Sequence, residues 1–282
     1  MSNTGIILWL QSFHTPVLDF LMKAITAIGG ETFYTIVIPI IYWCIDKRYG
    51  FSLGTVFMVS NWINLGLKDL FRIPRPSHAV VRVLDSVGGY SFPSSHAQGT
   101  ATFWVHLAAK IRRRWFTNVA IAVIVLVSLS RPYLGVHYPT DILAGAVLGT
   151  AIALIAYRLW ADKLDIPLWA FVIVPVLLVL LDRTADSAKA AGFLAGLGIG
   201  YNLDRRFLGF RVGGALWQQA VRTAVGLALL LGVRVGLKLV LPAGIWFDYI
   251  RYTAIGVTGG YLLPWLFVTV GLMARDEGAG PT

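Results

Sequence analysis

Charged residues are scarce in this sequence, and cysteine is almost absent. Asp, Glu, Lys and Arg make up 13% of its 282 residues, against about 25% in a typical soluble domain. Together with the high apolar content described below, this scarcity excludes an intrinsically disordered chain, a collagen-like repeat and a coiled coil. The single cysteine, Cys44, excludes a disulfide within the chain. We expect no cleavable signal peptide, because the first apolar run, at 6–10, is short and follows no basic segment.

Apolar residues are present in excess. They account for 57% of the chain, and the mean hydropathy is +0.70. A water-soluble core of this size cannot bury so much apolar surface, so the composition predicts an integral membrane protein in contact with membrane lipids. The net charge of +10 is typical of membrane proteins, which keep Lys and Arg in their cytoplasmic loops, and we expect no nucleic-acid partner.

Long apolar runs predict an all-α, polytopic membrane helix bundle with about nine transmembrane helices. A spanning helix needs roughly 20 mainly apolar residues. Residues 1–28 mix aromatic and polar positions and therefore predict an N-terminal interfacial or re-entrant segment. The nine predicted spans are 29–46, 51–71, 95–111, 115–131, 138–160, 166–182, 187–203, 216–240 and 251–274.

The distribution of Lys and Arg predicts the orientation of this bundle. One set of alternate loops carries twelve of them and the opposite set carries eight, and cytoplasmic loops are usually the more basic. We therefore expect a protein of the plasma or inner membrane with its C-terminus in the cytoplasm. Its N-terminus and the long loop at 72–94 should be extracytoplasmic. The loops of the basic set lie at 47–48, 110–114, 158–163, 205–211 and 275.

Three short segments at predicted extracytoplasmic helix ends, 68–76, 93–96 and 130–141, concentrate polar residues. Lys68, Arg75 and Arg131 supply three positive charges against one nearby carboxylate, Asp141. Arg binds phosphate in a bidentate manner and Lys acts as a point charge. The cluster therefore favours an oxyanion with two or more negative charges.

Two of these segments begin helices. Ser94 or Ser95 is a natural N-cap, and Pro139 suits the first position of the following helix. Backbone N–H groups at the start of a helix bind phosphate well, so both helix starts should contribute to an anion cradle.

The histidines suggest what happens to the bound oxyanion. His137 and Asp141 are four residues apart, within reach of each other. A carboxylate that holds one imidazole nitrogen leaves the other free to attack, and His96 can protonate the leaving oxygen. This pattern predicts covalent phosphoryl transfer through phosphohistidine. A metal site built from the same three side chains is disfavoured, because hard divalent ions prefer oxygen ligands and the nearby cations oppose zinc.

In this order the three segments resemble the signature of the type 2 phosphatidate phosphatase superfamily, the lipid phosphate phosphatases. The first matches Lys-x6-Arg-Pro and the third matches Ser-Arg-x5-His-x3-Asp at every specified position. The second reads Pro-Ser-Ser-His, with Ser95 in place of the glycine of Pro-Ser-Gly-His. The resemblance covers roughly residues 30–182. It implies a six-helix catalytic core at 29–182, followed by a three-helix C-terminal extension at 183–282 within one membrane domain.

The resemblance also implies a role for each matching residue. His137 would be the nucleophile, Asp141 its orienting carboxylate, and His96 the general acid and then the general base for water. No metal and no other cofactor is needed in this family. The implied phosphate-binding residues are Lys68, Arg75, Ser94 and Arg131, with backbone N–H groups near Ser95 and His96.

The leading hypothesis is a metal-independent phosphatase of a lipid phosphate or lipid diphosphate, such as undecaprenyl diphosphate, acting at the extracytoplasmic membrane surface. Alternatives are a phosphatase of a soluble phosphomonoester such as a sugar phosphate, and a lipid phosphotransferase. A transporter or lipid-binding protein is the non-enzyme alternative, although binding alone does not need both histidines. The sequence predicts neither the substrate nor the oligomeric state.

Arg234 and Lys238 lie outside the resemblance, four residues apart on one face of a predicted span. A charged residue within the membrane usually faces a partner or a water-filled cavity. One interpretation is an ion pair of Arg234 with Asp182 or Asp248. The other is a second anion contact, for a diphosphate or a lipid headgroup.

Overall fold

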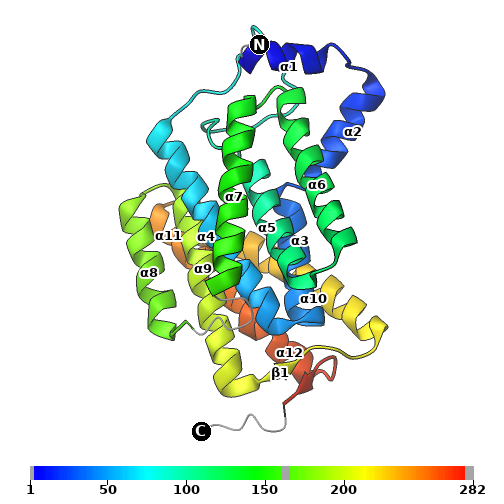
Figure 1. The fold of residues 1–282 in the computed structure, drawn as a ribbon. Coiled ribbons are helices and arrows are strands. Elements are labelled where there is room, and N and C mark those ends of the chain that lie inside the picture. The colour runs from blue at the N-terminus through cyan, green and yellow to red at the C-terminus, as the bar shows by residue number, and fades with distance from the viewer. Residues whose placement is uncertain (1–2, 160–165, 277–282) are drawn as a thin grey trace. The chain divides into compact units, whose positions relative to one another are not determined.

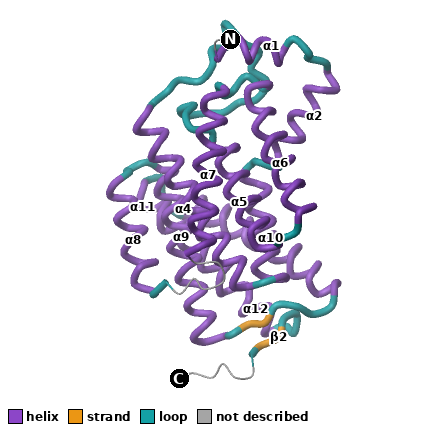
Figure 2. Tube along the Cα trace, in the orientation of Figure 1, coloured by secondary structure: helices purple, strands orange, loops and turns teal. Residues whose placement is uncertain are grey.

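The computed structural model describes residues 3–159 and 166–276 of the chain. Almost all of its regular structure is helical, as the sequence predicts (Figures 1 and 2). Two short strands pair antiparallel, with Phe210 opposite Arg275. The C-terminal residues and the end of the basic loop at 158–163, both predicted to be cytoplasmic, lie outside the described residues.

The helices and strands follow one another in a simple order. The first half of the chain forms α1 (Asn3–Gln11), α2 (Pro16–Ala27), α3 (Glu31–Ile40), the π-helical turn η1 (Ile41–Ile45), α4 (Lys47–Phe71), α5 (Ser95–Ile111), α6 (Arg114–Tyr133) and α7 (Pro139–Leu159). The second half forms α8 (Leu168–Leu181), α9 (Ala185–Leu203), η2 (Asp204–Leu208), β1 (Phe210–Arg211), α10 (Leu216–Val240), α11 (Ile245–Val257), η3 (Thr258–Leu262), α12 (Leu263–Thr269) and β2 (Ala274–Arg275).

Helix occupies most of each of the nine predicted spans. By length and composition, α6, α7 and α10 can each cross a membrane, and α8 is a shorter apolar helix. Helix α2 forms a further apolar candidate together with α3 and η1, which it meets at a bend of 44°. The chain is therefore a membrane-spanning helical protein, and the number of nine spans stays a prediction.

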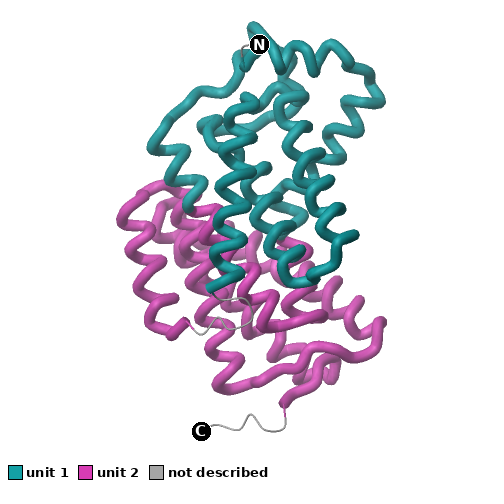
Figure 3. Tube along the Cα trace, in the orientation of Figure 1, with its two compact units in different colours: residues 1–34, 63–159 teal, residues 35–62, 160–282 magenta. Residues whose placement is uncertain are grey.

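The chain forms two compact units, coloured separately in Figure 3. Unit 1 comprises residues 1–34 and 63–159, and unit 2 comprises residues 35–62 and 160–282. These units alternate along the chain. The division into an interfacial segment, a catalytic core and a C-terminal extension stays a prediction.

In unit 1, glycines allow α7 to pack directly on the backbone of α5. A Cβ atom on Gly149 would lie 2.2 Å from the carbonyl oxygen of Gln98, and one on Gly145 would lie 2.6 Å from that of Ser94. Small residues permit such close approach between membrane helices. The N-termini of the two helices are consequently adjacent, and the Ser94 N–H donates to the Asp141 carbonyl at 3.1 Å.

In unit 2, a glycine likewise allows α9 to pack directly on the backbone of α11. A Cβ atom on Gly196 would lie 2.1 Å from the carbonyl oxygen of Thr253. A second anchor is the buried carboxylate of Asp204, which accepts from the Lys47 ammonium at 2.6 Å. Aromatic packing around the fully buried Trp43 completes the core of this unit.

Candidate active site

The predicted catalytic and phosphate-binding residues of the three segments all belong to unit 1. Ser94 is the N-cap of α5, since its hydroxyl oxygen accepts from the Ala97 N–H, and Pro139 begins α7 as predicted. The Ser95 hydroxyl donates to the Asn64 side chain at 2.8 Å, so this serine also fastens α5 to α4. Both serines thus fix the position of the helix start that carries His96.

His137 lies in the turn before α7, with its imidazole buried against Asp141. Its Nδ1 is 3.3 Å from Asp141 Oδ2. The same oxygen accepts from the Tyr138 N–H at 2.9 Å and from the Ser91 hydroxyl. Three donors to one carboxylate favour its ionised form, and an ionised Asp141 favours the His137 tautomer with the proton on Nδ1. Nε2 then carries the lone pair.

Arg75 contacts this second nitrogen. Its Nη1 lies 3.1 Å from His137 Nε2 and donates to the Val136 carbonyl at 2.9 Å. The other guanidinium nitrogens donate to the carbonyls of Gly88 and Gly89. Arg75 therefore ties the 72–94 loop to His137 and brings a cation next to His137 Nε2.

Lys68 is buried near the end of α4. Its ammonium donates to the Tyr90 carbonyl at 2.7 Å and more weakly to that of Ser91 at 3.4 Å. An ammonium group has three donors, so one further bond is available for an anion.

Arg131 is fully buried, and its guanidinium is only half used. Nη1 donates to the Thr26 hydroxyl at 2.7 Å and to the Asp85 carboxylate at 3.1 Å. Within residues 3–159 and 166–276, Nε and Nη2 have no hydrogen-bond partner. These two nitrogens form one edge of the planar group, the geometry that binds a phosphate through two parallel hydrogen bonds. An unpaired buried donor is costly, so this edge is suited to an anionic ligand.

His96 completes the cluster. It lies in the first turn of α5, close enough to Arg131, Arg75 and Lys68 for their positive charges to act on its imidazole. The structure thus assembles both histidines, the carboxylate and the three cations that the sequence pattern selected. Among the described residues, no group of three or more His, Cys, Asp or Glu side chains is arranged to hold a metal ion.

Burial and neighbouring charge shift the pKa of the two loop residues in this cluster. Burial lowers the pKa of His137 below its usual value; the hydrogen bond to Asp141 opposes the shift, and the cations Arg75, Lys68 and Arg131 add to it. Burial also lowers the pKa of Arg75, against the attraction of Asp141 and Asp85. The His137 imidazole is therefore neutral at physiological pH, as a nucleophile must be.

Several contacting residues lie outside the sequence motifs. Gln11 donates to the carbonyls of Arg82 and Tyr133 at 2.6 and 2.8 Å, so α1 fastens both site loops. Thr26, Asp85 and Ser91 contact Arg131 or Asp141 directly. Gln11 and Thr26 are isolated polar residues in the amphipathic segment 1–28, and this polarity was the only sign of them in the sequence. Their spacing did not indicate that they contact the candidate active site.

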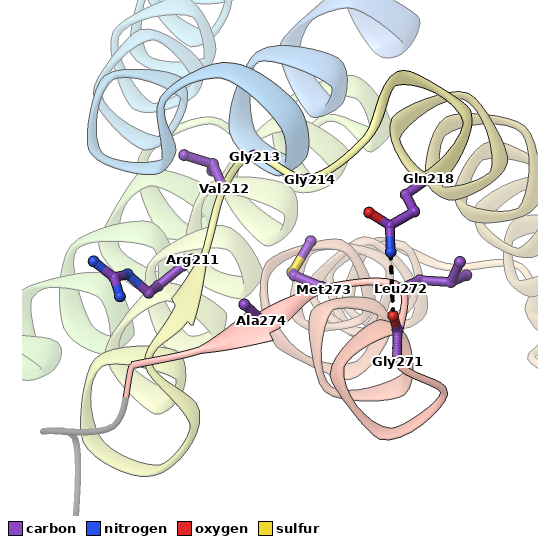
Figure 4. Close-up of a pocket in the computed structure, with 9 residues that line it drawn as sticks. All are labelled: Arg211, Val212, Gly213, Gly214, Gln218, Gly271, Leu272, Met273 and Ala274. Carbon is purple, nitrogen blue, oxygen red and sulfur yellow. Dashed lines mark hydrogen bonds between the residues drawn. The ribbon is translucent and has the colours of Figure 1, made fainter.

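A cavity of about 350 Å³ adjoins the cluster and is lined by Arg75, Asp85, Val136 and neighbouring residues of the 72–94 loop. Unit 2 has a separate cavity of about 210 Å³ beside Arg211, Gly213 and Gly214, where Gln218 donates to the Gly271 carbonyl (Figure 4). None of the predicted site residues lines the cavity in unit 2.

Arg234 and Lys238 are exposed on α10 in unit 2. Neither side chain forms a hydrogen bond or ion pair within the part of the chain that the structure describes, and Asp248 is paired with Arg251 instead. The interpretation of an ion pair of Arg234 with Asp182 or Asp248 is therefore wrong. A role of Arg234 and Lys238 as a second anion contact stays a prediction.

The helical membrane fold, with two histidines within a cluster of cations, is that of a membrane phosphatase. Two family models match the chain: the PAP2 superfamily over residues 49–165, and the transmembrane extension of PAP2 superfamily phosphatases over residues 188–275. The chain belongs to the PAP2 superfamily, as the sequence motifs indicated.

Relatives are found among lipid phosphatases. Sphingosine-1-phosphate phosphatase 2 of Mus musculus is 31% identical over 52% of this chain and 44% of its own length. Lipid A 4'-phosphatase of Bacteroides thetaiotaomicron is 27% identical over 52% of this chain and 72% of its own. The match therefore spans less than half of the sphingosine-1-phosphate phosphatase.

A solved structure shares the fold. The transmembrane PAP2-type phosphatidylglycerolphosphate phosphatase of Bacillus subtilis superposes with a TM-score of 0.51 and 24% identity. The superposition covers 58% of this chain and 86% of that one.

Proposed function

We propose that the chain is a membrane phosphatase that hydrolyses a lipid phosphate or lipid diphosphate at the extracytoplasmic surface, without a metal, through a phosphohistidine. The observation that carries the proposal is the buried His137–Asp141 pair beside three cations, one of which keeps a bidentate edge unpaired. The names of the relatives, which pair phosphatase activity with lipid phosphates, support the substrate class.

The proposed reaction has two steps. In the first, the Nε2 lone pair of His137 attacks phosphorus, the phosphorus–oxygen bond of the substrate breaks, and His96 protonates the leaving oxygen. Asp141 stabilises the positive charge that develops on the His137 ring. In the second, His96 removes a proton from water, the resulting oxygen nucleophile attacks phosphorus, and the His137–phosphorus bond breaks.

The cations stabilise the charge that moves during these steps. Arg131 would hold two phosphoryl oxygens through Nε and Nη2, while Arg75 and Lys68 neutralise the remaining charge. Backbone N–H groups at the start of α5 would add further donors. Because these groups already supply the positive charge, no divalent ion is required.

The test is phosphate release by purified full-length protein in detergent micelles. The substrates are sphingosine 1-phosphate, phosphatidate, phosphatidylglycerol phosphate, undecaprenyl diphosphate and a sugar phosphate, each with excess EDTA. We expect release from at least one lipid, and loss of several orders of magnitude in His137→Ala. Activity that needs added zinc or magnesium, or that survives in His137→Ala, would contradict the mechanism. Release from the sugar phosphate alone would favour the soluble-substrate alternative.

A further inference from the structure

Asp85 is a carboxylate that the proposed reaction does not use, yet it contacts the phosphate-binding arginine. Its Oδ2 accepts from Arg131 Nη1 at 3.1 Å. The Arg131 side chain is 0% exposed, whereas that of Asp85 is 35% exposed. One end of this ion pair is therefore buried in the site, and the other is accessible from solvent.

The accessible end faces a defined space. Asp85 lines the cavity of about 350 Å³ together with Arg75, His78, Ser86 and Val136. Val136 precedes the nucleophile, and Arg75 contacts the nucleophile directly. A substrate held at His137 would consequently have the part next to its phosphate within reach of this cavity.

Asp85 contacts Arg131 Nη1, so its negative charge would act on a phosphate bound to the other edge of the guanidinium. A phosphate on the Nε–Nη2 edge of Arg131 would be separated from the Asp85 carboxylate by the width of one guanidinium group. The guanidinium between them offsets part of their repulsion. A bound phosphate monoester brings about two negative charges, which with Asp85 and Asp141 make about four, against the three positive charges of Lys68, Arg75 and Arg131. A positive charge on the substrate itself, beside Asp85, would balance the remaining negative charge.

We infer that Asp85 is a specificity-determining residue, and that it selects a phosphate monoester with an ammonium group a few bonds from the phosphate. The ammonium would donate to the solvent-accessible carboxylate of Asp85 while Arg131 holds the phosphate. The same carboxylate discriminates against a diphosphate, whose second phosphate would add negative charge near it. This inference rests on the proposed function and narrows its substrate class.

The first test compares two substrates that differ only in the relevant group: sphinganine 1-phosphate and 3-hydroxyoctadecyl phosphate, which lacks the amine. The wild-type protein should prefer the amine in kcat/KM by about tenfold, the scale of one charge-assisted hydrogen bond. Asp85→Asn should bring this ratio close to one and raise the relative rate on a lipid diphosphate. Asp186→Asn is the charge-matched control, because Asp186 is an exposed partner of Lys189 in unit 2; it should leave the ratio unchanged.

A merely structural role of Asp85, holding Arg131 in place, predicts a different result. Asp85→Asn would then lower kcat/KM equally on both substrates and preserve their ratio, which would overturn the inference. A wild-type ratio near one would overturn it as well.

The second test measures binding without turnover. In the His137→Ala background, the dissociation constants of the two lipids are measured by competition in detergent, with Asp85 intact or changed to Asn. An amine preference that disappears in Asp85→Asn supports the inference even if the wild-type protein releases no phosphate, an outcome that would refute the proposed function alone. Equal affinity for both lipids with Asp85 intact refutes the assignment of Asp85.

Discussion

Arg131 offers a phosphate a bidentate contact that a lysine side chain cannot provide. Arg131 is fully buried, and its Nη1 donates to Thr26 and Asp85. Its Nε and Nη2 have no partner among the described residues and can bind a ligand. Lysine carries the same charge but has no planar edge. We expect Arg131→Lys to lower kcat/KM by about 10²–10³-fold, the usual cost of removing a donor to a transition-state oxyanion.

Arg82→Lys is the matched control for that measurement. Arg82 pairs with Asp19 near the surface of the same unit, at 3.0 Å, with its side chain 42% exposed. Such exposed ion pairs contribute little to stability, so Arg82→Lys should change kcat/KM by no more than about twofold. A similar loss in both variants would show that the buried edge of Arg131 has no special role.

The pH dependence of the reaction should reflect the burial of His137. Its pKa is lowered mainly by burial and further by cations, Arg75 foremost among them. Protonation removes the lone pair that attacks, so activity falls as the pH drops through this pKa. The acid limb of kcat/KM should therefore lie below pH 6.5, the usual pKa of histidine. Arg75→Met removes a positive charge, which raises the His137 pKa and should move the limb to higher pH.

The pH profiles of the wild-type and Arg75→Met proteins are measured with the same substrate. The second ionisation of its phosphate, near pH 6, then affects both profiles equally. Arg75→Met should also lower the plateau of kcat/KM, but the position of the limb is independent of the plateau. A limb that does not move, or that moves to lower pH, would argue that Arg75 does not act on the nucleophile.

The sequence motifs predicted some of the side chains that meet in the candidate active site, but not all of them. The spacings around Lys68, Arg131 and His137 were sufficient to predict which side chains meet, because each lies near the start or end of a helix. Thr26 and Asp85 were not predicted, because they reach Arg131 across 105 and 46 residues of sequence. Such contacts depend on how distant segments of the chain pack, so short sequence motifs cannot predict them.

Among the elements, the contact between α5 and α7 determines the distance between the two helix N-termini. Gly149→Ala would bring a Cβ within 2.2 Å of the Gln98 carbonyl oxygen, a backbone atom that cannot move aside alone. Overpacking of this kind typically costs about 1–3 kcal/mol. We expect a lower melting temperature in detergent and reduced kcat, since the separation of Ser94 and Asp141 would change with the helices.

Gly66 on α4 provides the control, because a Cβ there has no atom within 4 Å among the described residues outside the adjacent backbone of its own helix. Gly66→Ala should keep activity and slightly raise stability, since alanine favours helix by about 0.5–1 kcal/mol over glycine. If both variants behaved alike, close packing of α5 on α7 would not be what positions the site.

Helix positions were more predictable than helix type. Apolar runs of spanning length indicate where helices lie, and the structure has helix in each predicted range. The range 251–274 was expected to form one helix, but it is divided into α11, η3 and α12, and α11 already begins at Ile245. A π-helical turn inserts one residue into the backbone hydrogen-bond ladder without changing the apolar composition. The helical backbone is continuous from Ile245 to Thr269, and composition cannot reveal the π-helical turn within it.

For the whole molecule, the side of the membrane that holds the site is the main prediction still to be tested. The basic loops predict that the 72–94 loop is extracytoplasmic and that the 110–114 loop is cytoplasmic. The native Cys44 is buried and is first replaced by serine, giving a background without thiols. Ala79→Cys and Arg113→Cys are then introduced separately, at exposed positions of the two loops.

In intact cells, a membrane-impermeant maleimide should label Ala79→Cys, whereas Arg113→Cys should react only after permeabilisation. Both variants should retain phosphatase activity, since neither position contacts the histidines or the phosphate-binding cations. The reverse pattern would place Lys68, Arg131 and His137 on the cytoplasmic face, because they lie at the same helix ends as the 72–94 loop. The enzyme would then act on lipids of the inner leaflet, and the excess of basic residues in the 110–114 loop would need another cause.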